Sequence, residues 1–177
     1  MINIMSKVKL NDLNVFVIHL IRETSREPII KKLKKTFPDL KVFPAIDKKD
    51  LSWNKWKNLK KFHRLPTHQN REVIMGEVAL SLTNLKLLKY IVKNKLNNVL
   101  VLEDDAIINT NKGTFPKYLK LSRDIALYYL GGHVWNSKLW GTYAIIYPNW
   151  NLTREVLEEL INPKRFRAWD SMMVNYI

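Results

Sequence analysis

The 177-residue sequence has no cysteine, only five glycines and no apolar run of membrane-spanning length. The lack of cysteine excludes disulfide bonds and thiolate metal ligands and suits a reducing compartment. The first ten residues contain lysines but no apolar segment of the kind that a signal peptide needs. We therefore expect a soluble protein without a transmembrane segment, located in a bacterial or infected-host cytoplasm.

Several well-known site motifs are also missing. The sequence has no Walker loop, no Gly-x-Gly-x-x-Gly and no Gly-x-Ser-x-Gly, and His63 and His68 match no zinc-site spacing. These absences argue against a P-loop protein, a dinucleotide-binding Rossmann protein, a serine or cysteine hydrolase and a zinc enzyme.

An acidic block follows a short apolar run. Residues 99–102 are β-compatible and predict a buried strand, and Glu103, Asp104 and Asp105 come directly after it. Three adjacent carboxylates resist desolvation, and a divalent cation or a bound basic group would relieve that cost. Ligands of open α/β sheets bind at the carboxyl ends of the strands. The alternative is a polar strand end with solvated acids.

Extended backbone through the acidic block would point Glu103 and Asp105 to one side and Asp104 to the other. Three consecutive acids would then address two different groups.

The order of the other elements predicts an α/β fold in one domain, with a mostly parallel sheet flanked by helices. Residues 15–20 and 40–46 predict strands around a helix at 29–37, which Thr24 or Ser25 caps, with Pro28 in its first turn. A long amphipathic helix is expected over 76–94, with Asn84 inside its apolar arc, where its amide needs a backbone or ligand partner. Further on, we expect a short helix at 116–123, strands at 125–130 and 142–147, and a helix to residue 161 capped by Asn151 or Thr153.

Positive charge is abundant and unevenly distributed. The net charge is +14, and the segment between Lys31 and Arg64 has twelve Lys/Arg against three Asp. Such a field attracts nucleic acid, an anionic membrane or a phosphorylated small molecule, whereas the alternative is a solvated lysine-rich surface. Trp53 and Trp56 lie among these lysines, but their spacing with Leu59 favours an amphipathic helix over a stacking surface for bases.

An ordered set of motifs resembles glycosyltransferase family 25, which includes lipopolysaccharide β-galactosyltransferases and procollagen galactosyltransferases. The matching motifs are Val17-Ile18-His19-Leu20 with Arg22 and Arg26, Ala45-Ile46-Asp47, Gly76-Glu77-Val78-Ala79 through Lys86, Leu100-Val101-Leu102-Glu103-Asp104-Asp105, Gly141-Thr142-Tyr143-Ala144 and Asp170.

The resemblance implies a GT-A-like (Rossmann-like) fold and a metal-dependent inverting transfer of a hexose. The implied donor is UDP-galactose or UDP-glucose, the cofactor is Mn²⁺ or Mg²⁺, and the acceptor is a glycan or a hydroxylated protein. We expect residues 1–177 to form a single glycosyltransferase domain that lacks part of the C-terminal acceptor region, because the chain stops seven residues after Asp170.

The resemblance also assigns roles to individual residues. Asp105 and Glu103 would bind the metal, and Asp170 would be the catalytic base or would orient the acceptor. Donor contacts would come from Arg22, Arg26, Asn84, Glu103 and Asp104.

Two motifs depart from the family pattern. His19-Leu20-Ile21-Arg22 replaces Asn-Leu-Asp-Arg, which removes an amide and a carboxylate, and Thr83-Asn84 replaces Ser-His. We therefore keep three hypotheses in order: a glycosyltransferase, a related protein that binds a nucleotide sugar without transfer, and a basic nucleic-acid-binding protein.

Overall fold

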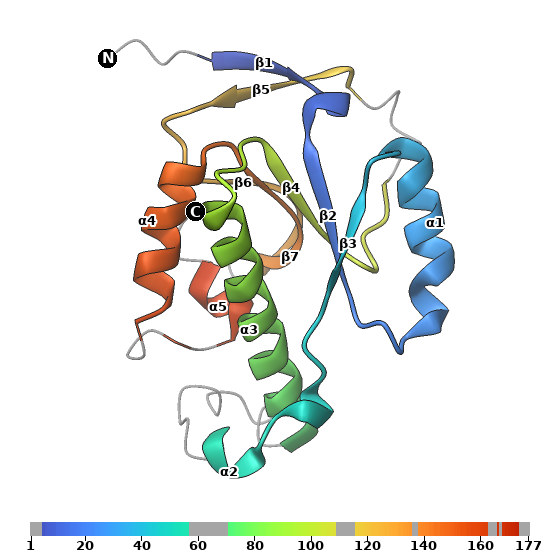
Figure 1. Cartoon of the computed structure of the whole chain (residues 1–177), viewed down its shortest axis with the longest axis vertical. Coiled ribbons are helices and arrows are strands. Elements are labelled where there is room, and N and C mark those ends of the chain that lie inside the picture. Colours follow the sequence, from blue (N-terminus) through green and yellow to red (C-terminus); the bar gives the residue numbers. More distant parts are fainter. Residues whose placement is uncertain are drawn as a thin grey trace.

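The computed structural model describes residues 5–56, 71–108, 116–135, 138–162, 166 and 168–173. Its main sheet has five strands in the order β3-β2-β4-β7-β6, and a separate two-stranded ribbon pairs β1 with β5 (Figure 1). Among the described helices, none is both long enough and apolar enough to cross a membrane.

The predicted α/β class is confirmed, but the main sheet is mixed and not mostly parallel. β2 (Asn14–His19) runs parallel to β3 (Lys41–Pro44) and to β4 (Val99–Glu103). β7 (Lys138–Tyr147) runs antiparallel to both β4 and β6 (Tyr128–Trp135). β6 and β7 follow each other closely in the chain, and strands joined by a short connection pair antiparallel.

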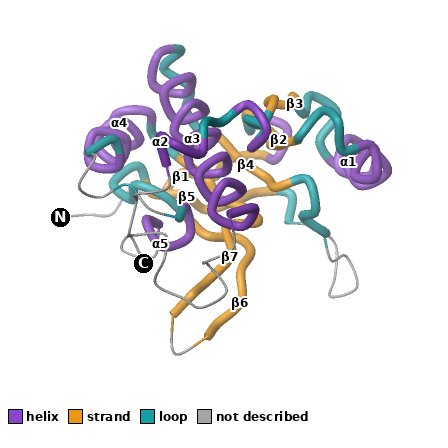
Figure 2. The backbone as a smooth tube through the Cα atoms, turned by 90° about the horizontal axis from the view of Figure 1, so that it is seen from below, coloured by secondary structure: helices purple, strands orange, loops and turns teal. Residues whose placement is uncertain are grey.

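Helices cover both faces of this sheet. α1 (Glu27–Thr36) lies on one face, and α3 (Arg71–Lys93), α4 (Trp150–Leu160) and α5 (Trp169–Met173) lie on the other (Figures 1 and 2). Side chains along β2 point alternately to the two faces of the sheet. Val17 packs in the core with α1, whereas Phe16 and Ile18 pack in the core with α3. The β2-α1-β3 and β3-α3-β4 connections therefore form a doubly covered α/β unit.

The ribbon was not predicted. β5 (Tyr118–Ser122) occupies the region where a short helix was expected, and it pairs antiparallel with β1 (Met5–Lys9). Leu121 of β5 and Val8 of β1 are buried in the core that contains α1. Pairing with a strand more than a hundred residues away decided the conformation of this short segment, and local sequence carries no signal for that.

The bounds of several other helices and strands differ from the predicted ones. β6 begins at Tyr128 and continues through the glycine pair that was expected to end it, and β7 and α3 begin earlier than predicted. The helix at 53–56 is present as α2 (Trp53–Trp56), and Leu59 lies outside the described residues.

The predicted caps differ as well. Asn149 caps α4, because its side chain accepts a hydrogen bond from the backbone N–H of Asn151. α1 has no side-chain cap, since Thr24–Arg26 forms a 3-10 turn (η2) that leads into it.

Candidate functional site

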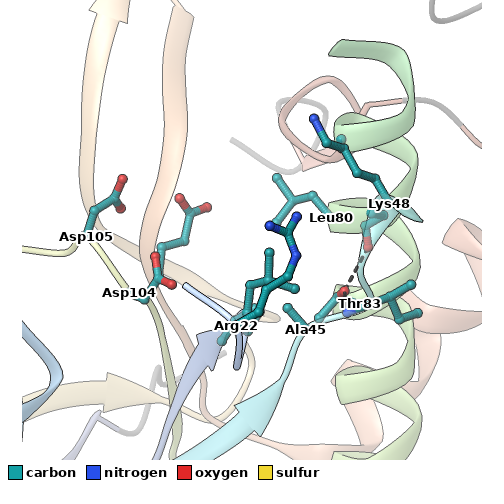
Figure 3. A pocket seen from close by; sticks show the side chains of 13 residues that line it. Arg22, Ala45, Lys48, Leu80, Thr83, Asp104 and Asp105 are labelled. Carbon is teal, nitrogen blue, oxygen red and sulfur yellow. Dashed lines mark hydrogen bonds between the residues drawn. The ribbon is translucent and has the colours of Figure 1, made fainter. Parts of the chain in front are cut away.

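A pocket lies where the carboxyl ends of β2, β3 and β4 meet the first half of α3 (Figure 3). Its volume is about 240 Å³. The wall combines apolar residues with acids and two cations: Ile18, Leu20, Arg22, Ala45, Ile46, Lys48, Gly76, Ala79, Leu80, Thr83, Glu103, Asp104 and Asp105. The acidic block and Arg22, far apart in sequence, are thus brought to one site at the sheet edge where ligands of α/β proteins bind.

The acidic block turns sharply at this edge. β4 pairs with β2 as far as the Ile18 and Glu103 partners, and the N–H of Ala106 then donates to the carbonyl of Glu103 at 3.0 Å. Asp104 and Asp105 therefore lie in a turn, and the predicted alternation of the three acids does not hold. All three acids line the same pocket.

Each aspartate of this turn contacts a different basic side chain. Asp104 Oδ2 lies 2.8 Å from Nδ1 of His19, and Asp105 Oδ2 lies 3.6 Å from Nη2 of Arg26. The other oxygen of Asp105, Oδ1, is buried and has no hydrogen-bond partner within the described part of the chain. A buried, unpaired carboxylate oxygen is costly and points to a missing cationic or hydrogen-bonding ligand.

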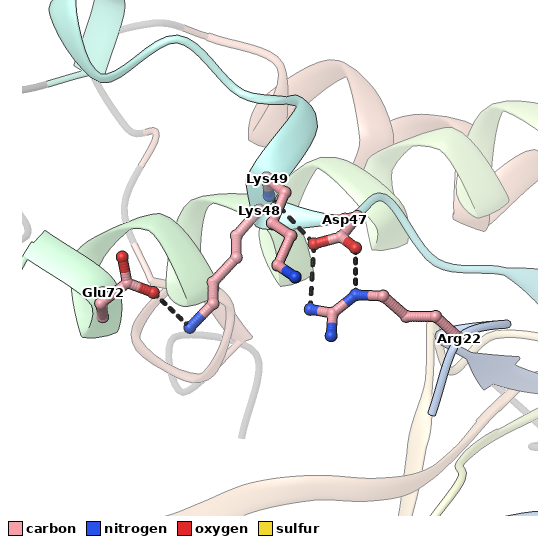
Figure 4. Close-up of polar contacts among 5 residues, drawn as sticks. All are labelled: Arg22, Asp47, Lys48, Lys49 and Glu72. Carbon is pink, nitrogen blue, oxygen red and sulfur yellow. Dashed lines mark hydrogen bonds and ion pairs between the residues drawn. The ribbon is translucent and has the colours of Figure 1, made fainter. Parts of the chain in front are cut away.

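Arg22 and Asp47 form a two-point ion pair beside the pocket (Figure 4). Nε of Arg22 donates to Oδ2, and Nη2 donates to Oδ1 at 3.2 Å. Asp47 Oδ1 also accepts from the N–H of Lys49 at 2.9 Å. Hydrogen bonding to Arg22 is the main cause that lowers the pKa of Asp47, to about 2, and the same contact raises the pKa of Arg22.

Lys48 adds a second cation to the pocket wall. Its Nζ lies 2.8 Å from a carboxylate oxygen of Glu72 at the start of α3 (Figure 4). Lys48 was not predicted as a pocket residue, although it directly follows the Ala45-Ile46-Asp47 motif.

Thr83 and Asn84 have different places. Thr83 lines the pocket, where its hydroxyl accepts from the N–H of Ile46 at 2.9 Å and donates to the carbonyl of Ala79 at 2.7 Å. Asn84 is buried and donates to the carbonyl of Leu80 at 3.1 Å. A backbone group is thus a partner of the Asn84 amide, and Asn84 is absent from the pocket wall. Its donor-binding role stays a prediction.

Asp170 lies on α5, near α3 and β6, and not in the wall of this pocket. Burial, and next the nearby charge of Asp170, raise the pKa values of Glu77 and Tyr129. Glu77 follows Gly76 of the pocket wall, but neither Glu77 nor Asp170 lines the pocket, and the catalytic role of Asp170 stays a prediction. A salt bridge to Arg165 or Arg167 is the alternative role that the sequence leaves open for Asp170, and both arginines lie outside the described residues.

A second, larger cavity, with fewer charged residues in its wall, lies on the other side of Asp105. Its volume is about 810 Å³, and Arg26 lines this cavity instead of the first one. Asp105 is part of both walls. The two arginines predicted to act together therefore face different cavities.

The donor set fits a divalent cation that is shared with a ligand. Among the described residues, no three His, Asp, Glu or Cys side chains are grouped to hold a metal alone. Asp105 still offers an unpaired oxygen. Because Mg²⁺-type ions are commonly held by one or two carboxylates together with substrate phosphates, one protein carboxylate beside cationic side chains suits a metal–diphosphate ligand.

These features define an α/β protein with a pocket of both acidic and basic side chains at the carboxyl ends of its parallel strands. The model of glycosyltransferase family 25 (LPS biosynthesis protein) matches residues 12–153. The chain therefore belongs to glycosyltransferase family 25, which implies glycosyl transfer between a sugar donor and an acceptor. A search of the curated proteins found no match. The family match includes the pocket residues, and Asp170 lies beyond it.

Proposed function

We propose that the chain is a metal-dependent, inverting hexosyltransferase with a GT-A-like fold. The donor is UDP-galactose or UDP-glucose, the metal is Mn²⁺ or Mg²⁺, and the acceptor is a glycan or a hydroxylated protein. The observation that supports this proposal most directly is the pocket. It combines Arg22 with Oδ1 of Asp105, which has no hydrogen-bond partner among the described residues. Family membership supports the reaction class, and the pocket supports the phosphate-bearing donor.

In this proposal the nucleotide sugar lies in the first pocket. The guanidinium of Arg22 and the ammonium of Lys48 attract its diphosphate, while Ile18, Leu20 and Leu80 supply apolar contacts. Gly76 keeps the helix side of the pocket open, because a Cβ at this position would meet no atom within 4 Å. Asp105 and Glu103 would hold the metal, which supplies charge stabilisation for the departing diphosphate.

The transfer step needs a base. The acceptor oxygen bonds to the anomeric carbon on the face opposite the diphosphate, and the bond from that carbon to the diphosphate breaks with its electron pair on UDP. The Asp170 carboxylate takes the proton of the acceptor hydroxyl. Glu77, whose pKa is raised mainly by burial, lies near enough to interact with the charge of Asp170.

A thermal-shift experiment tests donor binding. UDP, GDP and CMP are each added with and without Mn²⁺, and UDP with Mn²⁺ is expected to stabilise the protein. A ligand at 100 times its Kd raises the Tm of a chain this size by roughly 5–10 °C. Asp105→Ala should lose this shift. Asp12→Ala is the matched control, because Asp12 is exposed and precedes β2 at the end away from the pocket.

The outcomes of this experiment separate two claims. No stabilisation of the wild type by any nucleotide contradicts the donor site. A UDP shift that survives Asp105→Ala contradicts the metal role of Asp105.

The second candidate function is donor binding without transfer. It is favoured by Thr83 and Asn84, which replace the family's Ser-His pair and hydrogen-bond to carbonyls of their own helix. Release of UDP from UDP-galactose or UDP-glucose by water distinguishes the two candidates. Transfer predicts turnover that Asp170→Asn lowers by about 100-fold or more, with the UDP shift retained. A UDP shift without any wild-type turnover supports the second candidate.

A further inference from the structure

His19 links three strand ends that surround the pocket. It is the last residue of β2 and is only 6% exposed. Its carbonyl accepts from the N–H of Ala45 at 2.9 Å, and its ring Nδ1 lies 2.8 Å from Asp104 Oδ2. One buried residue therefore connects the end of β2 with pocket residues that follow β3 and β4.

The contact between the His19 ring and Asp104 lies directly after the last backbone pairing of β2 with β4. Ile18 and Glu103 are the last partners between β2 and β4. His19 follows Ile18 directly, and Asp104 follows Glu103. An ionised carboxylate only accepts hydrogen bonds, so Nδ1 of His19 carries the hydrogen and donates it to Asp104. This charge-assisted bond replaces the missing backbone contact and fixes the side chain of Asp104 at the turn.

The chemistry of position 19 explains one departure from the family pattern. The family motif that residues 19–22 resemble has asparagine at this position. The amide nitrogen of asparagine is bonded to Cγ, as Nδ1 is in histidine. Both side chains can therefore present an N–H at the same place relative to the backbone. The change from asparagine to histidine keeps the donor that the sequence comparison counted as lost.

We propose that His19 is a positioning residue of the donor pocket, which holds Asp104 so that the pocket binds a nucleoside diphosphate with its metal. This inference rests on the proposed donor site. His19 acts through Asp104, which lines the pocket, whereas His19 is not part of the wall.

Calorimetric titration with UDP in the presence of Mn²⁺ tests this role. His19→Phe keeps an aromatic ring and removes the N–H, and it should raise the Kd for UDP at least about tenfold, as loss of such supporting contacts does. His19→Asn keeps an N–H on the atom bonded to Cγ and should bind UDP as the wild type does. Should His19→Phe fail to fold, His19→Leu takes its place.

A double-mutant cycle identifies the path of the effect. If His19 acts through Asp104, then His19→Phe should add little to the loss already caused by Asp104→Ala. The Tm of each variant is measured in parallel, because a purely structural histidine would lower the Tm and leave the Kd of the folded protein unchanged.

The possible results are distinguishable. Wild-type protein that does not bind UDP contradicts the proposed function and this inference with it. Wild-type binding together with an unchanged Kd in His19→Phe, an increased Kd in His19→Asn equal to that in His19→Phe, or additive effects in the cycle overturns the role of His19 alone.

Discussion

Arg22 and Arg26 lie four positions apart in one loop, and the sequence suggests the same role for both. In the structure Arg22 lines the smaller pocket and is held by both carboxylate oxygens of Asp47. Arg26 lines the larger cavity and makes one looser contact, at 3.6 Å, with Asp105. The difference is one of orientation, because only Arg22 is held at two points.

The two-point contact leaves part of the Arg22 guanidinium available. Asp47 accepts hydrogen bonds from Nε and Nη2, whereas Nη1 makes no hydrogen bond to the described residues. A guanidinium bound along one edge can still offer its two terminal nitrogens to a phosphate. Asp47 therefore orients the cation while leaving it able to bind a ligand, and Arg26 has no comparable support.

The largest effect is expected from removal of Arg22. Arg22→Ala should raise the Kd for UDP in the presence of Mn²⁺ by about 10-fold to 100-fold, because a charged hydrogen bond to phosphate is lost. Arg22→Lys should recover little of this affinity, since an ammonium cannot make the two-point contact with Asp47. Calorimetric titration measures both variants. An Arg22→Ala variant that binds UDP as tightly as the wild type would contradict the role of Arg22 in donor binding, and with it the proposed difference between Arg22 and Arg26.

A smaller effect is expected from the partner of Arg22. The pKa of Asp47 is lowered to about 2 from an ordinary 3.8, mainly by the hydrogen bond with Arg22. Because this pKa is lower in the folded protein, the stabilisation is present above pH 3.8 and is lost as the pH falls towards 2. In an NMR titration, Arg22→Ala should raise the pKa of Asp47 towards its ordinary value.

Asp47→Asn tests the orienting role of the same pair. It should weaken UDP binding less than Arg22→Ala does, since the cation remains but its orientation is less restricted. Asp39→Asn, which changes an exposed aspartate of the α1–β3 connection, is the matched control. An unchanged pKa of Asp47 in Arg22→Ala, or an unchanged Kd in Asp47→Asn, would show that the pair has no such role.

The smallest effect is expected at Arg26. Its ion pair with Asp105 is partly exposed and long, and such pairs contribute little. Arg26→Ala should therefore change the Kd for UDP in the presence of Mn²⁺ by less than about fivefold. A loss equal to that of Arg22→Ala would place both arginines at the donor, as the sequence suggested, and would remove the distinction drawn from the two cavities.

Local patterns predicted much of the parallel half of the sheet. The apolar runs of β2 and β4, the helix with Pro28 in its first turn and the long amphipathic α3 are present. Asn98, which precedes β4, adopts a φ of 52°, which asparagine tolerates better than most residues. The antiparallel strands were predicted less well. The separate ribbon of β1 and β5 depends on pairing between distant segments, and β6 of the main sheet passes through two glycines.

The candidate site shows the same division. The acidic block and Arg22 could be selected from sequence because charged residues next to buried strands need a chemical reason. His19, Lys48 and Thr83 could not be selected in this way, since their roles depend on contacts with Asp104, Glu72 and Ile46. Such contacts join segments that lie tens of residues apart in the chain.

The sequence by itself determined the residue types at the sheet edge, the helices and strands with strong periodicity, and the family to which the chain belongs. Tertiary structure decided the direction of β6 and β7, the turn that directs all three acids into one pocket, and the separation of Arg22 from Arg26. The physical reason is that periodicity and charge are properties of neighbouring residues, whereas strand pairing and ion-pair geometry arise only when distant segments pack together.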